Sequence, residues 1–295
     1  MFYTANNSKL QVNGNEILAS DAQISLQTNL QPNYNITQRH TADFRATNGV
    51  GGTLSFNYYL TGVDYFKSFI TGQAEMPFTA SQVISGNFGG LNFDSGYLTS
   101  YSVNFGPNAL ATANASISFF DQLNGEFDPT VEEAPTNKEV LNFKNATVSH
   151  YIPITNETLS GTVEEFVEGT FNYDCEVKPV YLMGETKPSS VNFGPKNVSM
   201  NFETDNPTGY LPFSGNAARI SVGLQNSQGT QVEAFTCSGV MRGRNLATSV
   251  GDYIKQTINI TQASTQGTNV YVASIIDSSG VAGNIGAGTS GGGNV

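Results

Sequence analysis

The most regular feature of the sequence is an alternation of apolar residues with small polar residues. Thr53–Tyr58 reads TLSFNY and Ala115–Phe119 reads ASISF, so apolar side chains recur at every second position. Side chains of a β-strand point alternately to the two faces of its sheet, and this period is typical of half-buried antiparallel strands. The same pattern predicts strands in five further stretches: Ile24–Gln27, Ser100–Phe105, Val198–Phe202, Ile220–Leu224 and Thr257–Ile260.

Helical spacing of apolar residues is rare. Within Val63–Ile70 the apolar positions fall on one face of a helix, and a glycine stands on each side of the segment. Gly-Pro, Asn-Gly and Gly-Gly pairs separate the alternating stretches and indicate turns. The sequence therefore predicts a mainly β protein with one short helix near Val63–Ile70.

The hexamer SVNFGP occurs at Ser102–Pro107 and again at Ser190–Pro195. When these copies are aligned, the similarity ends on both sides of the hexamer. We interpret the recurrence as shared hairpin chemistry, in which a strand ends before a Gly-Pro turn. The first copy is expected in a late hairpin of its half of the chain, and the second copy in an early one.

A different offset, of about 140 residues, aligns longer segments and indicates an internal duplication. Leu54–Tyr58 matches Val198–Phe202, and Thr99–Thr112 matches Thr236–Thr248 with one gap. The alternative is that alternating β patterns align readily with one another. The prediction is two tandem related β-sandwich or barrel domains, each with at most one short helix.

The predicted domain boundaries follow changes in composition. Residues 1–125 form the first domain, residues 126–154 a polar linker that carries acids and proline, and residues 155–262 the second domain. Residues 263–295 hold one more possible strand and a Gly-rich tail that is expected to be flexible.

The charge of the chain argues against nucleic-acid binding. The formal net charge is −11, only 13% of the residues are charged, and no cluster of Lys and Arg stands out. A protein that holds nucleic acid needs cations that replace the condensed counterions of the phosphates. The N-terminus MFYTANNSKL lacks the pattern of a signal peptide, and no stretch is apolar enough for a membrane span.

Catalytic and metal-binding patterns are not supported either. The Gly-rich tail formally contains G-x-G-x-x-G and G-x-S-x-G, but both motifs need a strand–turn–helix context. His40 and His150 lack the partner spacing of a metal site, and Cys175 and Cys237 are expected to be buried thiols. We therefore expect a protein that is not an enzyme and has no cofactor.

With catalysis unsupported, self-assembly becomes the leading class, and here a resemblance enters. The chain resembles bacteriophage major tail tube proteins of the long-tailed type, in which one chain carries two tube domains. The resemblance rests on strand ends of the form Asn-x-Leu-Ala-Thr within Thr99–Phe119 and, with one gap, within Thr236–Ile260, and on early long hairpins near Gln23–Tyr59 and Glu165–Phe202. It covers residues 12–262 and carries no invariant motif.

The resemblance implies rings whose inner strands join into one continuous β-barrel and which stack into a tube. Two tube domains per chain imply a trimeric ring with pseudo-sixfold symmetry. The implied partners are other copies of the chain, a tape-measure protein and tail terminator and tip proteins, with DNA passing without specific binding. The implied location is the virion tail, assembled in the host cytoplasm.

Two sets of residues follow from this implied architecture. Acidic and neutral polar side chains suit a channel wall that must not hold phosphate. The candidates for facing the lumen are Glu164, Glu165, Glu168, Asp174, Glu176, Gln23, Gln27 and Gln31. The candidates for ring-stacking loops are Tyr34, His40, Asn48, Gly49, Lys178 and Lys187.

Two other classes of function stay open at this point. One is a capsid-decorating or fibre-like virion protein, which an internal duplication with inner hairpins disfavours. The other is a carbohydrate-binding β-sandwich. Sugar sites commonly use exposed Trp, and the chain contains none.

Overall fold

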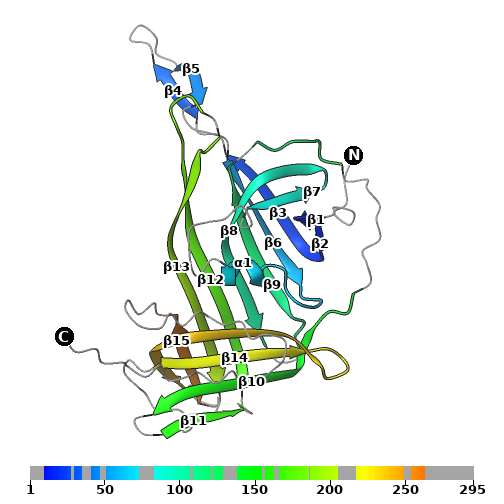
Figure 1. The fold of residues 1–295 in the computed structure, drawn as a ribbon, viewed down its shortest axis with the longest axis vertical. Coiled ribbons are helices and arrows are strands. Elements are labelled where there is room, and N and C mark those ends of the chain that lie inside the picture. Colours follow the sequence, from blue (N-terminus) through cyan, green and yellow to red (C-terminus); the bar gives the residue numbers. More distant parts are fainter. Residues whose placement is uncertain are drawn as a thin grey trace, which may run out of the picture.

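The computed structural model of the chain describes residues 10–27, 30–34, 41–46, 51–72, 83–106, 109–120, 122–128, 138–154, 157–162, 166–185, 187–204, 217–248 and 254–262. The regular structure of these residues is almost entirely antiparallel β, which confirms the mainly β prediction (Figure 1). The short helix α1 (Lys67–Gly72) lies close to its predicted place but begins later, after a turn. No helix in the described part of the chain could cross a membrane.

The strands of the N-terminal half form a continuous path in the sheet. Their order is β2-β1-β7-β8-β9-β6-β3, and every neighbouring pair is antiparallel. The bounds are β1 (Leu10–Val12), β2 (Asn15–Ile17), β3 (Ala19–Gln27), β6 (Gly51–Tyr59), β7 (Ile84–Phe88), β8 (Leu91–Phe105) and β9 (Thr112–Phe119).

The strands of the C-terminal half repeat this order. The path is β11-β10-β14-β15-β16-β13-β12, which matches the first path strand for strand. The bounds are β10 (Asn142–Ile154), β11 (Glu157–Thr162), β12 (Phe166–Val180), β13 (Ser190–Thr204), β14 (Ala217–Gln225), β15 (Gln231–Ala247) and β16 (Lys255–Thr261). Residues 142–154, which the sequence assigned to a linker, are therefore a strand of the second path.

The two paths join where β8 pairs with β12. Ser100–Phe105 of β8 lie opposite Gly169–Asp174 of β12, and together the strands form one open sheet of 14 strands. None of the described sheets closes into a barrel within the single chain, so the barrel form is not seen there. Only the first half carries a further hairpin, β4 (Leu30–Tyr34) with β5 (Thr41–Ala46), among the described residues.

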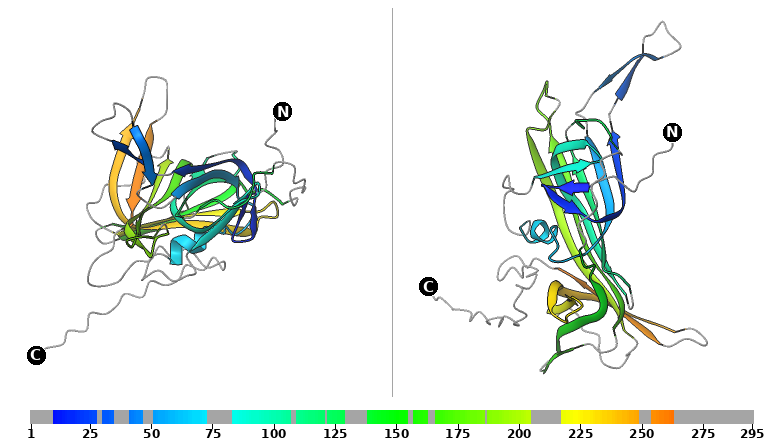
Figure 2. Two further views of the ribbon diagram at one scale, coloured as in Figure 1. Left: turned by 90° about the horizontal axis from the view of Figure 1, so that it is seen from above. Right: turned by 90° about the vertical axis from the view of Figure 1, so that its right-hand side faces the viewer.

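The core lies between layers of strands that cross each other. Figures 1 and 2 show β10, β14 and the adjoining part of β15 running across the direction of β12 and β13. Where the halves meet, the ring centroid of Phe235 lies 6.4 Å from that of Tyr101, 5.7 Å from that of Phe105 and 5.7 Å from that of Phe171. Both cysteines are free and buried, as expected.

The two SVNFGP copies lie in different slots, but only the first ends a strand. The first copy ends β8, whereas the second copy opens β13, and Pro195 lies inside that strand. The pairing register of β12 and β13 shifts between Cys175 and Val177, next to this proline. Proline lacks the N–H that a regular ladder needs, so it is accommodated at such a bulge. The interpretation of the second copy as a strand end before a turn is therefore wrong.

Strand pairing also tests the two aligned segments. Leu54–Tyr58 and Val198–Phe202 lie on β6 and β13, which hold the same place in the two paths. Thr112 pairs with Asn104 as Thr257 pairs with Asn245. The counterpart of Thr112 is thus Thr257 rather than Thr248, and the second alignment matched the correct strand β15 in the wrong register.

Candidate functional site

One face of seven adjoining strands is built from small polar side chains, and we call it the polar face. It belongs to β3, β6, β9, β8, β12, β13 and β16, whose opposite face packs into the core. One row of directly paired residues crosses all seven strands: Asp21, Asn57, Asn114, Ser102, Asn172, Ser199 and Thr261. The alternation in the sequence thus places Asn, Ser and Thr on one side of a continuous surface.

Side chains of the polar face hydrogen-bond to one another across the strands. The Nδ2 atom of Asn57 donates to both carboxylate oxygens of Asp21, at 3.0 and 2.8 Å. The Nδ2 atom of Asn114 donates to Oδ1 of Asn57 at 2.7 Å, and the hydroxyls of Ser55 and Ser116 lie 3.1 Å apart. Part of the hydrogen-bonding capacity of these side chains is therefore used within the face.

The acidic lumen candidates of β12 share this face. Glu168, Asp174 and Glu176 are exposed, and they alternate with buried residues of the core face, Phe171 and Tyr173 among them. Glu164 and Glu165 lie outside the described residues. The structure thus brings three of the five predicted acids together on one side of one strand.

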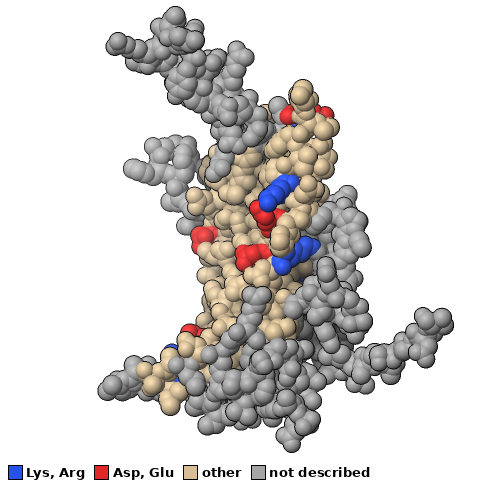
Figure 3. Space-filling view, turned by 90° about the vertical axis from the view of Figure 1, so that its left-hand side faces the viewer, with Lys and Arg blue, Asp and Glu red and all other residues tan. Residues whose placement is uncertain are grey.

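Lysines accompany some of these carboxylates. The Nζ atom of Lys178 lies 2.8 Å from Oε1 of Glu176, and Nζ of Lys255 lies 2.9 Å from Oε1 of Glu203. Figure 3 shows basic and acidic groups next to each other on a surface that is mostly uncharged. The polar face is therefore mostly uncharged, with two lysine–carboxylate pairs beside the further carboxylates Asp21, Glu168 and Asp174.

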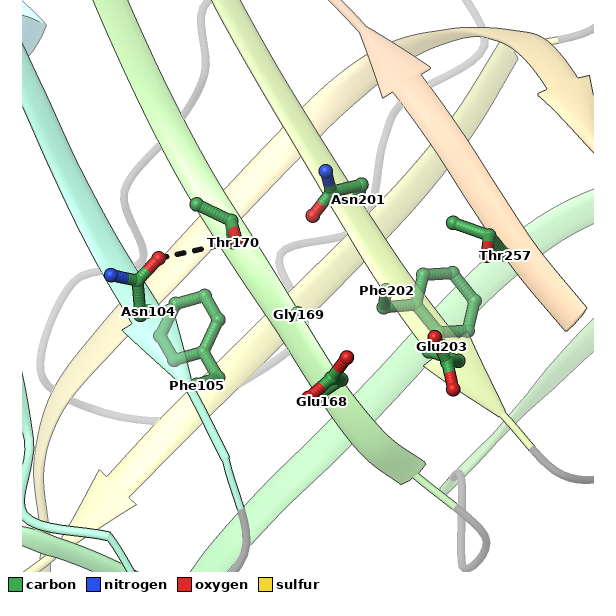
Figure 4. Close-up of a pocket in the computed structure, with 9 residues that line it drawn as sticks. All are labelled: Asn104, Phe105, Glu168, Gly169, Thr170, Asn201, Phe202, Glu203 and Thr257. Carbon is green, nitrogen blue, oxygen red and sulfur yellow. Dashed lines mark hydrogen bonds between the residues drawn. The ribbon is translucent and has the colours of Figure 1, made fainter. Parts of the chain in front are cut away.

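A shallow depression of about 420 Å³ lies in the polar face where β8, β12, β13 and β16 meet (Figure 4). Glu168 and Glu203 are directly opposite each other there, and Thr170 Oγ1 donates to Asn104 Oδ1 at 3.3 Å. Its other described polar lining residues are neutral, so the depression offers hydrogen bonds without a nucleophile and base pair. Within the described ranges, no three His, Cys, Asp or Glu side chains are grouped so that they could hold a metal ion.

The predicted glutamines divide between two sheets. Gln23 lies on the polar face opposite Ser55, and the backbone of Gln27 pairs with Gly51. Gln31 lies in β4, which pairs only with β5 in a separate sheet among the described strands. Gln31 therefore lies in a different sheet from Gln23 and Gln27.

The ring-stacking candidates gather at one end of the molecule as far as they are described. Tyr34 ends β4, Lys178 lies near the end of β12, and Lys187 lies in the turn to β13. Figure 1 shows the β4–β5 hairpin and the turn between β12 and β13 at the same end. His40, Asn48 and Gly49 lie outside the described residues.

Two strand edges are open, one in each half, and each is equivalent to an edge that is covered in the other half. In the first half, the last part of β8 pairs with β9 on one side and with β12 on the other. In the second half, Met241–Ala247 of β15 pair with β16 alone among the described strands. At the far end of the first path, β3 pairs only with β6 among the described strands.

Cross-strand pairs identify β3 as the counterpart of β12. Asn57 pairs with Asn114 as Asn201 pairs with Asn259. On the other side, Asn57 pairs with Asp21 of β3, and Asn201 pairs with Thr170 of β12. The open edge of β3 is therefore equivalent to the edge through which β12 pairs with β8.

Apolar side chains of β3 are more exposed than their counterparts on β12, because the edge of β3 is open and that of β12 is covered by β8. Leu26 on β3 is 48% exposed, whereas its counterpart on β12, Cys175, is 4% exposed. Likewise, Ile24 is partly exposed, whereas its counterpart Tyr173 is fully buried. Apolar side chains of β3 thus lie open to solvent where the equivalent residues of β12 are covered by neighbouring strands.

Comparison with known proteins gives no indication of function, so the function is inferred from the polar face and the open edges. No protein-family model matches the chain, and no curated protein matches it. The sequence reasoning had missed the neutral row of the polar face and the two open edges. The signal for the row was present in the alternating stretches, where residues such as Ser55, Asn57 and Ser102 hold the polar positions.

Proposed function

We propose that the chain is a structural protein that assembles with copies of itself into rings, and that the rings stack into a phage tail tube through which DNA passes. The observation that carries this proposal is the repeated strand order, together with the two open edges at equivalent places. We infer from that order that the two halves are tandem related tube domains produced by duplication.

The open edges suit head-to-tail contact between copies. Inside the chain, β12 of the second half covers the edge of β8 in the first half. By the same geometry, β3 of the next copy would cover the edge of β15, and this contact would repeat around a ring. A heterologous contact of this kind gives a closed ring if its rotation closes, and such closure removes the edges that would otherwise aggregate.

Three copies would supply six repeated units, so we propose a trimeric ring with pseudo-sixfold symmetry. In such a ring the sheet would continue from chain to chain as a barrel, and the polar face would form the channel wall. A wall that is mostly uncharged and carries more carboxylates than lysines would make few contacts with phosphate, which would let DNA slide. The β4–β5 hairpin, which only the first half carries among the described residues, would project three times per ring toward the neighbouring ring.

Electron microscopy of the purified full chain tests this proposal directly. We expect rings or stacked tubes with threefold symmetry and a central channel. Filaments without a channel would overturn the tube, and isolated compact particles at every protein concentration would favour a capsid-decorating or fibre-like protein. Binding to a glycan array by a monomer would favour the carbohydrate-binding class.

A further inference from the structure

A buried polar cluster connects the two halves of the chain away from the polar face. Asp64, which follows β6, is 6% exposed. The hydroxyl of Tyr58 donates to both of its carboxylate oxygens, at 2.8 and 2.9 Å, and the N–H of Phe66 donates to Oδ1 at 3.1 Å. The hydroxyl of Tyr101 donates to the same carboxylate. These four residues all belong to the first half.

The second half contributes Glu233 of β15 to this cluster. Its Oε2 atom accepts the backbone N–H of Asp64 at 2.6 Å, and its Oε1 atom accepts the N–H of Ala234 at 2.7 Å. Oε1 also forms an ion pair with Nζ of Lys67 in α1. The side chain of Glu233 is 0% exposed and that of Lys67 is 16% exposed. The carboxylate of one half is thus held by a backbone N–H and a cation of the other half.

We propose that Glu233, the turn at Asp64 and Lys67 form a latch that fixes the outer strands β14 and β15 of the second half against α1 of the first half. This inference does not depend on the tube function. A buried ion pair is weak evidence for stability, because desolvation offsets the attraction between the charges. Its directional contacts do define one arrangement of the two surfaces, and that is the role we assign to it.

The position of the latch on β15 supports this role. Glu233 lies in the part of β15 that pairs with β14, whereas Met241–Ala247 pair with β16. The register shifts between Met241 and Gly243, so a bulge separates the two parts of the strand. Bulges bend a strand and increase its local twist. The angle of the outer strands is therefore not set by the β16 ladder alone, and the latch holds it beyond the bulge.

Hydrogen exchange with mass spectrometry tests the latch in the variants Lys67→Met and Glu233→Gln. Each substitution removes one partner and leaves the other buried group without its ion pair, which is costly. We expect the amides of residues 231–236 and 64–70 to exchange at least about tenfold faster, because local opening governs exchange in such units. Exchange in the paired segments Ser100–Phe105 and Gly169–Asp174 should stay as in the unsubstituted chain.

Controls separate a latch from general stabilisation. Lys178→Met removes the exposed pair with Glu176, whose side chains are 64% and 54% exposed, and it should leave exchange at residues 231–236 unchanged. Glu233→Gln is the milder variant because the amide oxygen still accepts hydrogen bonds. Uniformly faster exchange throughout the chain, or unchanged exchange at residues 64–70 and 231–236, would overturn the proposal.

The buried carboxyl of Asp64 makes the stability of this cluster sensitive to pH. The groups that face it are Asp64, Glu233, Lys67 and the two tyrosines, while Glu16 and Lys138 line the depression beside Asp64. Burial raises the pKa of the Asp64 carboxyl from 3.8 to about 6, although hydrogen bonds from Tyr101 and Tyr58 oppose this. A folded-state pKa above the unfolded value means that the folded chain binds the proton more tightly. Asp64 therefore adds stability as the pH falls from about 6 toward 3.8.

Urea denaturation at pH 7 and at about pH 5 checks this sign. The unfolding midpoint of the unsubstituted chain should rise at the lower pH by more than that of Asp64→Asn, which cannot titrate at this position. The comparison removes the contribution of the surface acids, which both chains share. Equal rises in the two chains would show that Asp64 does not titrate in this range, and would remove the pH dependence from the latch.

Discussion

A chain in which Asp21 and Asn245 are both replaced by cysteine should form disulfide-linked oligomers that end at a closed trimer. The prediction follows from the repeat: Asp21 on β3 is the counterpart of Thr170, and Asn245 on β15 is the counterpart of Asn104. Thr170 and Asn104 are directly opposite each other within the chain. Paired residues of antiparallel strands have Cβ atoms about 4.5–5.5 Å apart, close to the separation that a disulfide bridges.

The measurement is a non-reducing gel of the assembled protein after mild oxidation, followed by mass determination. The native thiols should not interfere, because Cys175 and Cys237 are buried and burial raises the pKa of both, that of Cys237 to about 12. Few thiolates then form at neutral pH. The unsubstituted chain should therefore stay monomeric on the gel.

A matched control uses a residue one strand further from the edge. Asn57 shares the row of Asp21 but lies on β6, so Asn57→Cys with Asn245→Cys should give almost no cross-linking. The chains that carry a single cysteine replacement should not form trimers. Equal cross-linking in the control pair would contradict the register between β3 and β15, while leaving a tube with another interface possible.

The strands of this fold could be predicted from the sequence because they are half-buried. Each alternating stretch, such as Thr53–Tyr58 or Val198–Phe202, lies within a strand of the structure. The segment 142–154 was missed because it was assigned to the linker together with the polar, acid-bearing residues before it. In the structure Pro153 pairs with Thr158 of β11 and lies beyond Tyr151, the last residue of β10 that pairs with β14. This end of β10 is open on one side among the described strands, and such a position accepts a proline more easily than a central one.

The surfaces were harder to predict than the strands because they depend on which distant strands become neighbours. Local alternation places Asn172 and Ser102 on polar positions, but only the long-range pairing of β12 with β8 places them side by side. Gln31 was grouped with Gln23 and Gln27 as a neutral polar residue of the first half. The structure has β3 ending at Gln27, with Gln31 in the separate β4–β5 hairpin.

The largest functional effect is expected from adding positive charge to the polar face. Ser102→Lys together with Asn172→Lys would place two ammonium groups per chain at adjacent paired positions, and a trimeric ring would carry six. The side chains project from the polar face and away from the core, so the fold should tolerate them. The two new charges lie within the screening length of about 8–10 Å at ordinary ionic strength, so they repel each other and a small loss of stability is expected.

Tubes of this double variant should retain short duplex DNA at low salt, whereas tubes of the unsubstituted chain should not. Each lysine that neutralises a phosphate releases counterions, and six such contacts per ring lose roughly a thousandfold in affinity between about 50 and 200 mM salt. Co-sedimentation of labelled duplex with assembled tubes over this salt range measures the effect. The control variant, Asn15→Lys with Gln228→Lys, adds the same charge at the exposed start of β2 and in the exposed turn after β14, away from the polar face. If the control retains DNA as strongly as the double variant, or if neither variant retains it, the polar face does not line the channel, even where electron microscopy shows a tube.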